Sequence, residues 1–178
     1  AKFSGGLISI QQFVPMWANM DAQFTIDGSQ LSMDHIAIET DGAKSEAVGA
    51  IDMAHWPEQT YQVTSRVGFP RMRELFFANE TWRLTGDGDF AGTFHLFKGG
   101  HDLRGHFTSP LAGVYDYRFP ATYGDLHWDK NGFQVTSAGA RFSGGDAKFS
   151  FTIEPLGSPI KPTGRFDATY TDLDLAEL

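Results

Sequence analysis

The chain has 178 residues, 41% of them hydrophobic, which is enough for one globular domain, or one domain and part of another, with a substantial apolar core. Its formal net charge is −8 and its basic residues are scattered, so nucleic-acid binding is disfavoured, because neutralising phosphates needs a basic face. The absence of cysteine excludes disulfides, thiolate metal sites and cysteine nucleophiles.

The first eighty residues read as a series of short strands that closes on a helix. Residues 7–20 are apolar with Pro15 in their middle, which predicts either a short strand and a turn or a broken helix. Alternating patterns then predict strands at 22–26, 31–39, 47–53 and 61–67. The pattern changes at 69–79, where Pro70 suits a first helical position and Met72, Leu75 and Phe76 recur at helical spacing. We expect this helix to cover the end or edge of a sheet.

Residues 81–119 are the most regular part of the sequence. Large apolar side chains recur at every second position, and glycines interrupt them on the same face. The apolar positions are Trp82, Leu84, Phe90, Phe94, Leu96, Leu103, Phe107, Leu111, Tyr115, Tyr117 and Phe119, and the glycines are Gly86, Gly92, Gly105 and Gly113. This period of two predicts half-buried β-strands.

The register of the first hairpin in this stretch can be predicted. With Gly99 and Gly100 as a two-residue loop, Phe94 lies opposite Gly105, and Gly92 lies opposite Phe107. Each glycine is then covered by an aromatic ring of the neighbouring strand. Glycines on the apolar face indicate that the sheet bends tightly there.

Further strands are predicted at 125–128, 133–140 and 147–154, and they suggest an internal repeat. When the chain is shifted by about 102 positions, Leu31 falls on Phe133 and Gly42 falls on Gly144. Two meanders of similar spacing also align in this way by chance, so the sequence leaves both interpretations open. If the repeat is real, residues 171–178 begin a second helix equivalent to 69–75.

Together these patterns predict an all-β fold, a curved antiparallel meander sheet that is either a groove or an open sandwich, with one short helix near 69–79. We divide the chain into a β unit that ends in the helix (1–80), a central hairpin ladder (81–124) and a second, repeat-like β unit (125–178). No apolar run reaches the roughly 18 residues of a membrane-spanning helix, and no signal peptide starts at Ala1. Because the sequence starts within a strand pattern and ends on a helix start, we expect it to be part of a longer protein.

No catalytic motif is present, and we predict neither enzymatic activity nor a cofactor. His95 and His106 share a polar face but lack a third metal ligand, so they are interpreted as surface imidazoles. The segment 87–89 (Asp-Gly-Asp) lacks the later ligands of a calcium loop and is interpreted as a polar turn. Asp172 and Asp174 fit the start of a helix without an active site.

Three stretches resemble the repeating units of the AsmA-like and TamB-like envelope proteins of Gram-negative bacteria. They are FAGTFHLFKGGHDLRGHF (90–107), YGDLHWDKNGFQVTSAGARFSGGDAKFSFTI (123–153) and the ending GRFDATYTDLDLAEL. In that family a short strand with Gly-x-Leu precedes an apolar strand and a Gly-Gly strand, and the unit closes on a strand that runs into Asp-Leu-Asp-Leu. The resemblance covers most of residues 22–178, and the helix at 69–79 departs from a purely β unit.

The resemblance implies a groove-shaped sheet in the periplasm, adjacent to the membrane and anchored to the inner membrane through a segment not present here. Such proteins are thought to carry phospholipid between membranes or to assist outer-membrane assembly, with lipid acyl chains or other envelope proteins as partners. No catalytic residue is implied. The implied acyl-binding residues are Phe90, Phe94, Leu96, Leu103, Phe107, Tyr115, Tyr117, Phe149, Phe151 and Ile153.

Two other functions fit the same pattern. The first is a non-enzymatic accessory β-sandwich, whose apolar face is its own core and whose surface docks on a larger membrane complex. The second is a carbohydrate-binding sandwich that uses exposed Trp56, Trp82 or Trp128 as stacking platforms. The sequence does not decide between a closed core and an open groove.

Overall fold

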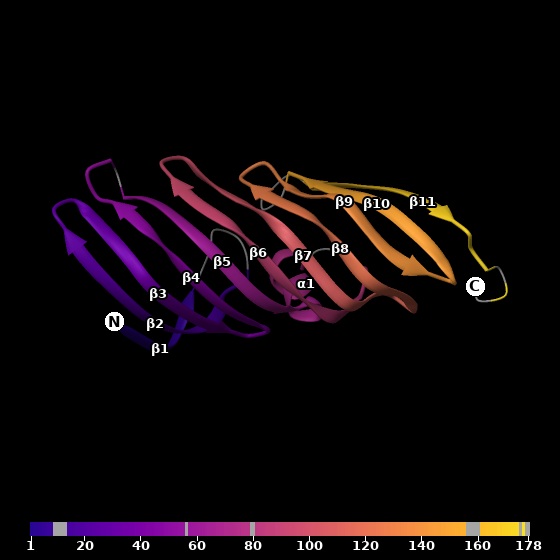
Figure 1. The fold of residues 1–178 in the computed structure, drawn as a ribbon, viewed down its shortest axis with the longest axis horizontal. Helices are drawn as coiled ribbons and strands as arrows, with labels where there is room; N and C mark the ends of the chain where they lie inside the picture. Colours follow the sequence, from indigo (N-terminus) through magenta and orange to yellow (C-terminus); the bar gives the residue numbers. More distant parts are fainter. Residues whose placement is uncertain (9–13, 56, 79–80, 156–160, 175, 177–178) are drawn as a thin grey trace.

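The computed structural model describes residues 1–8, 14–55, 57–78, 81–155, 161–174 and 176. These residues form one open antiparallel sheet of eleven strands, in which every strand pairs with its neighbours in sequence (Figure 1). The strands are β1 (Lys2–Ile8), β2 (Met16–Asp27), β3 (Gln30–Thr40), β4 (Ala43–Asp52), β5 (Glu58–Gly68), β6 (Leu84–Phe97), β7 (Gly100–Val114), β8 (Tyr117–Asp129), β9 (Phe133–Phe142), β10 (Gly145–Glu154) and β11 (Thr163–Thr171). The single described helix, α1 (Phe69–Phe76), lies between β5 and β6. The all-β meander with one short helix is therefore confirmed.

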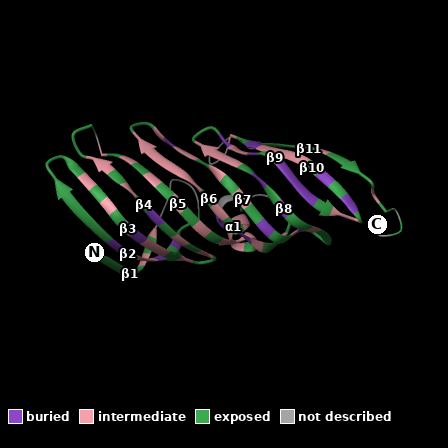
Figure 2. Cartoon of the chain, viewed as in Figure 1, coloured by how far each residue is buried: buried purple, intermediate pink, exposed green. Residues whose placement is uncertain are grey.

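The two faces of the sheet differ in burial, as the alternating colours along the strands in Figure 2 show. On one face, which we call the apolar face, Ala22, Ile36, Ala47, Val63 and Gly92 lie side by side across β2 to β6. The other, polar face carries the charged side chains. The apolar side chains are the more shielded set, although α1 is the only helix that packs on the sheet within the described residues.

Small side chains make up the tightest part of the apolar face. Ala22, Ile36 and Ala47 are only 2%, 6% and 7% exposed and form a buried cluster. Their neighbours Met20, Met33, Ile38, Tyr61 and Val63 are only partly buried, because no second sheet packs on them within the described residues. The core of this fold is thus a row of contacts along one face rather than an interior between two layers.

The hairpin of β6 and β7 differs from the predicted register by two residues. Its turn is Lys98–Gly99, where Gly99 adopts a φ of +99°, and Phe97 pairs with Gly100. Phe94 therefore lies opposite Leu103, and Gly92 lies opposite Gly105. The predicted pairing of each glycine with a phenylalanine is wrong, although a shift of two keeps the side chains between the turn and Asp89 on their predicted faces. Beyond the register shift at Asp87–Asp89, Leu111 lies opposite Asp87 on the polar face and not on the apolar face as predicted.

The Gly92–Gly105 pair is covered by Phe90, which lies on the same strand as Gly92. A Cβ atom on Gly92 would lie 2.1 Å from the carbonyl oxygen of Arg104 and 2.6 Å from Cζ of Phe90. We expect Gly92→Ala to lower the free energy of unfolding by about 1–3 kcal/mol, because backbone has to move. The matched control is Gly164→Ala, whose Cβ meets only Cε2 of Phe151 at 3.8 Å. Equal stability of the two variants in urea unfolding would contradict this account.

The strand pattern of β2 to β5 recurs in β8 to β11. β3 and β4 change register between the pairs Met33–Gly49 and Ile36–Ala47, and β9 and β10 do so between Val135–Phe151 and Ala138–Phe149, each 102 positions later. The turns agree as well, since Gly42 and Gly144 have φ angles of +86° and +76°. The spacing of about 102 positions seen in the sequence is therefore also found in the structure, where strands, turns and register shifts recur at that spacing.

Several boundaries differ from those expected. The helix ends at Phe76, where the backbone N–H of Phe77 donates to the carbonyl of Arg73 at 2.9 Å, rather than at 79. The apolar stretch 7–20 forms strand at both described ends, and residues 9–13 lie outside the described residues. Of the second helix expected at 171–178, residues 175, 177 and 178 also lie outside them, and Thr171 still belongs to β11. The sheet runs without interruption through the two unit boundaries proposed at 80 and 124.

Candidate functional site: the apolar face

The charged groups of the polar face largely pair with one another. Arg66 binds both Asp87 and Asp89, so the segment that resembled half a calcium loop holds a guanidinium instead. His95 lies 2.8 Å from Glu58, and His106 lies 3.1 Å from Asp125. Among the described residues no group of three or more His, Asp or Glu side chains is placed to hold a metal ion.

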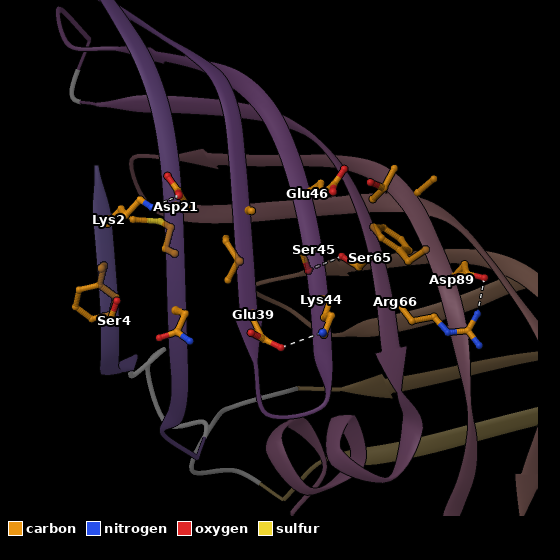
Figure 3. A pocket seen from close by; sticks show the side chains of 18 of the residues that line it. Lys2, Ser4, Asp21, Glu39, Lys44, Ser45, Glu46, Ser65, Arg66 and Asp89 are labelled. Atoms are coloured by element: carbon orange, nitrogen blue, oxygen red, sulfur yellow. Dashed lines mark hydrogen bonds and ion pairs between the residues drawn. The ribbon is translucent and has the colours of Figure 1, made fainter.

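A shallow hollow of about 830 Å³ lies between two rows of polar side chains on β1 to β7 (Figure 3). Its charged groups are mixed in sign and several of them pair directly, as Glu39 and Lys44 do at 3.1 Å. Of the ten residues proposed for acyl binding, only Phe90 borders it. Among its lining residues, three ion pairs join Lys2 with Asp21, Lys44 with Glu39 and Arg66 with Asp89, and only the carboxylate of Glu46 is left without an ion pair. The hollow therefore offers little unbalanced charge with which to select a ligand.

The apolar face is partly covered by α1 and the residues that follow it. The Phe77 ring lies 5.3 Å from the ring of Trp82 and 5.3 Å from the ring of Phe133 on β9, and Trp82 lies 6.4 Å from Phe151 on β10. Phe77 is 4% exposed. We call α1 together with Phe77 and Trp82 the cover. α1 packs on β5 and on β6, where Phe69 lies against Gly88, while Phe77 and Trp82 reach β9 and β10.

Two further aromatic clusters lie on the apolar face outside the cover. Near the β7–β8 turn, the ring of Phe142 stacks on Phe119 at 5.0 Å and lies near Tyr117 and Tyr170. Towards the other end of the strands, His101 packs between Phe94 at 6.4 Å and Trp128 at 4.3 Å. These two clusters form an apolar lining that no second sheet faces among the described residues.

Most of the residues proposed for acyl binding do lie on this lining. Phe90, Phe94, Leu96, Leu103 and Phe107 are half-buried on β6 and β7. Phe149 and Phe151 are half-buried on β10, whereas Ile153 is only 2% exposed and is closed off from any ligand. Tyr117 is 57% exposed near one end of β8. Tyr115 lies in the turn between β7 and β8 with a φ of +54°, away from the strands that form the face.

Sequence reasoning overlooked two parts of the site. Phe24 and Ile26 lie on the apolar face of β2 and are 45% and 64% exposed. The repeat could have identified them, because they correspond to Leu126 and Trp128. The packing of Phe77 and Trp82 on β9 and β10 had no signal in the sequence, since it joins segments more than fifty residues apart.

Among the described residues, His101 is the one buried titratable group of the apolar face. It is 8% exposed, and its Nε2 has no hydrogen-bond partner among the described residues. Burial lowers the pKa of its imidazole below the ordinary value of 6.5, against the opposing influence of Asp129 and Asp102. The folded chain therefore favours the neutral imidazole.

This burial predicts a loss of stability in mild acid. The unfolded chain binds a proton at His101 more readily than the folded chain, so the free energy of unfolding should fall as the pH drops through 6.5 and level off below the lowered pKa. Urea unfolding at pH 7.5 and 5.5 measures the loss, which should be smaller in His101→Phe. His55 has a pKa raised by its hydrogen bond to Asp52 and opposes the effect. An identical pH dependence in His101→Phe would contradict the prediction.

Comparison of the chain with protein-family models, curated proteins and solved structures finds no match. Within the described part of the chain, no helix has the length and apolar character needed to span a membrane. The function is therefore argued from the geometry of the apolar face and from the sequence resemblance.

Proposed function

We propose that the uncovered part of the apolar face binds lipid acyl chains. The observation that carries this proposal is the single layer: across the described residues, an eleven-stranded sheet presents an apolar face that only the cover shields. The resemblance to AsmA-like and TamB-like proteins supports the same function. On this basis we place the chain in the periplasm, in phospholipid transport or outer-membrane assembly, with acyl chains or other envelope proteins as its partners.

The binding surface proposed here is narrower than the set inferred from sequence. It is centred on β6 and β7, where Phe94, Leu96 and Leu103 are half-buried and outside the cover. It continues onto β2, where Phe24 and Ile26 are exposed. Ile153 is excluded because it is buried on β10, and Phe151 is excluded because it is engaged by Trp82.

The physical driving force is sufficient for useful affinity. Each methylene removed from water contributes about 0.8 kcal/mol, so burying about ten of them gives about 8 kcal/mol before the costs of immobilisation. A micromolar dissociation constant corresponds to about 8 kcal/mol. The costs of immobilisation lower this value, so an acyl chain must bury more than about ten methylenes on this face to reach micromolar affinity without a charged contact.

The test compares two neighbouring residues that point to opposite faces. Phe94→Asp places a carboxylate on the apolar face, whereas Thr93→Asp places it on the polar face, opposite Arg104. We expect Phe94→Asp to weaken binding of a fluorescent fatty acid at least tenfold and Thr93→Asp to leave it unchanged. Circular dichroism checks that both variants fold, and Leu103→Gln serves as a milder second variant. Unchanged affinity in folded Phe94→Asp and Leu103→Gln would refute the proposal.

The two other candidate functions have less support. A sandwich whose apolar face is its own core requires a second sheet, and the described residues form only one. A carbohydrate platform requires exposed indoles, but Trp82 packs on Phe77 and Phe151, and Trp128 packs on His101. Trp56 lies outside the described residues.

A further inference from the structure

One polar residue, His101, lies inside the proposed acyl-binding surface. It belongs to the apolar face of β7, where it pairs directly with Leu96 of β6, and Leu103 follows it two positions later on the same strand. Its ring lies 6.4 Å from the ring of Phe94 and 4.3 Å from the ring of Trp128. His101 therefore lies among the residues on which acyl binding is centred.

The imidazole of His101 is shielded without being hydrogen-bonded at Nε2. The side chain is 8% exposed, and Nε2 has no hydrogen-bond partner among the described residues. The residues of β6 that face it, Phe94 and Leu96, are apolar. A buried polar atom without a partner is costly, and a buried charge without a partner is costlier still. The folded chain thus accommodates this ring in its neutral form.

Two carboxylates lie near His101, and both have other partners. Asp102, its neighbour on β7, lies 2.8 Å from Arg104 and 2.8 Å from His127 on the polar face. Asp129 of β8 accepts hydrogen bonds from two backbone N–H groups of the β8–β9 turn, at 2.7 Å and 3.1 Å. Burial lowers the pKa of His101 more than these two charges raise it. Neither carboxylate therefore offsets the cost of a buried imidazolium.

The other charged groups at this end of β7 do not favour a proton on His101 either. On β6, His95 lies on the polar face and pairs with Glu58 at 2.8 Å. Lys130 of the β8–β9 turn lies beside Gly100, where a Cβ atom would be 3.5 Å from its Cδ. Its positive charge disfavours a second positive charge on the next residue.

Hydration of a protonated His101 and binding of an acyl chain require the same space. An imidazolium has two N–H donors, and because Nε2 has no protein acceptor, water has to satisfy that donor. The backbone of the sheet lies behind the side chain, so water approaches from the open side of the apolar face. The same side is where an acyl chain in contact with Phe94 and Leu96 lies.

We propose that protonation of His101 releases a bound acyl chain, so that lipid binding on the apolar face is coupled to pH. The inference rests on the proposed function, because it concerns the same surface. At neutral pH the ring is neutral, and the acyl chain covers it together with Phe94 and Leu96. In mild acid the imidazolium draws water onto this surface, and the affinity for the acyl chain falls. The coupling is reciprocal, so bound lipid also makes His101 harder to protonate.

The test measures the affinity for a fluorescent lysophosphatidylcholine, below its micelle concentration, between pH 7.5 and 5.0. This probe carries one acyl chain, and its head group keeps the same charge over the whole range. We expect binding to weaken roughly fivefold or more towards the acid end, while circular dichroism records the range in which the chain is folded. Constant affinity over that range would refute the coupling but not acyl binding, whereas no binding at pH 7.5 would refute both.

Two histidine variants assign the effect to one face of the sheet. His101→Phe removes the titrating group and keeps an aromatic ring, so the ratio of its dissociation constants at the two ends of the range should approach one. His106→Gln removes an imidazole from the polar face, where His106 lies 3.1 Å from Asp125, and should keep the ratio of the unmodified chain. A fall in affinity that persists in His101→Phe would overturn the proposal.

An NMR titration of the unmodified chain provides a readout that needs no substitution. The imidazole signals of His101 should titrate at a lower pH with the lysophosphatidylcholine bound than without it, and those of His106 should titrate at the same pH in both cases. Equal titration midpoints of His101 in the free and lipid-bound chain would contradict the coupling.

Discussion

Replacing Phe77 by alanine should lower the free energy of unfolding by about 3–5 kcal/mol, as expected for truncation of a fully buried aromatic ring. Phe77 is 4% exposed and contacts both Trp82 within the cover and Phe133 on β9. Its removal leaves a cavity between the cover and the sheet and weakens the packing of the cover on β9. Urea unfolding monitored by tryptophan fluorescence measures the change.

The control for this variant is Tyr117→Ala on the same face. Tyr117 contacts Phe142 but is 57% exposed, so its truncation should cost much less than that of Phe77. Phe77→Ala should also bind more of the fluorescent fatty acid than the unmodified chain, because loosening the cover uncovers Phe133 and Phe151. Equal stability losses in Phe77→Ala and Tyr117→Ala would show that the cover does not pack as described.

The second large effect is expected at Ile153, and the internal repeat supplies its control. Ile153→Ala should cost about 2–5 kcal/mol, because this side chain is 2% exposed, next to Phe133 on the covered part of the face. Ile51 occupies the corresponding position on β4, 102 positions earlier, but is only half-buried. Ile51→Ala should therefore cost distinctly less.

The comparison of the two isoleucines isolates the effect of the cover. Both residues lie near the end of a strand and pair across the sheet with an apolar partner, Leu31 for Ile51 and Phe133 for Ile153. They differ in their surroundings, because Ile153 lies on the covered part of the apolar face and Ile51 does not. If the two alanine variants lost the same stability in urea, the burial of Ile153 would not depend on the cover, and the asymmetry between the two halves of the sheet would have no energetic consequence.

Much of the fold follows from the alternation of apolar and polar residues, which has a period of two only in strands. The alternation correctly assigned Phe90, Phe94 and Leu103 to one face, because the face of a side chain depends only on its parity, that is, on whether its position along the strand is odd or even. The register predicted for β6 and β7 was wrong because two adjacent glycines allow two turns. The sequence does not distinguish a turn at Lys98–Gly99 from one at Gly99–Gly100.

The candidate site was predicted less completely than the strands. Parity placed residues on the apolar face but did not reveal which of them are covered, so Ile153 was proposed as a ligand contact although it is closed off. The cover brings Phe77 and Trp82 onto strands that come more than fifty residues later, and no local pattern encodes such a contact. Tyr115 continued the alternation in sequence but lies in a turn with a positive φ, where the alternation of faces ends.

The most direct test of acyl binding is photo-cross-linking from the two faces of one strand. The photoreactive residue p-benzoylphenylalanine, placed at Phe94 or at Thr93, probes the apolar or the polar face at almost the same position along β6. After irradiation with phosphatidylcholine vesicles, intact mass spectrometry should show a phospholipid adduct at position 94 and little or none at position 93. Equal labelling at the two positions, or no labelling at position 94 in a folded protein, would contradict an open acyl-binding face.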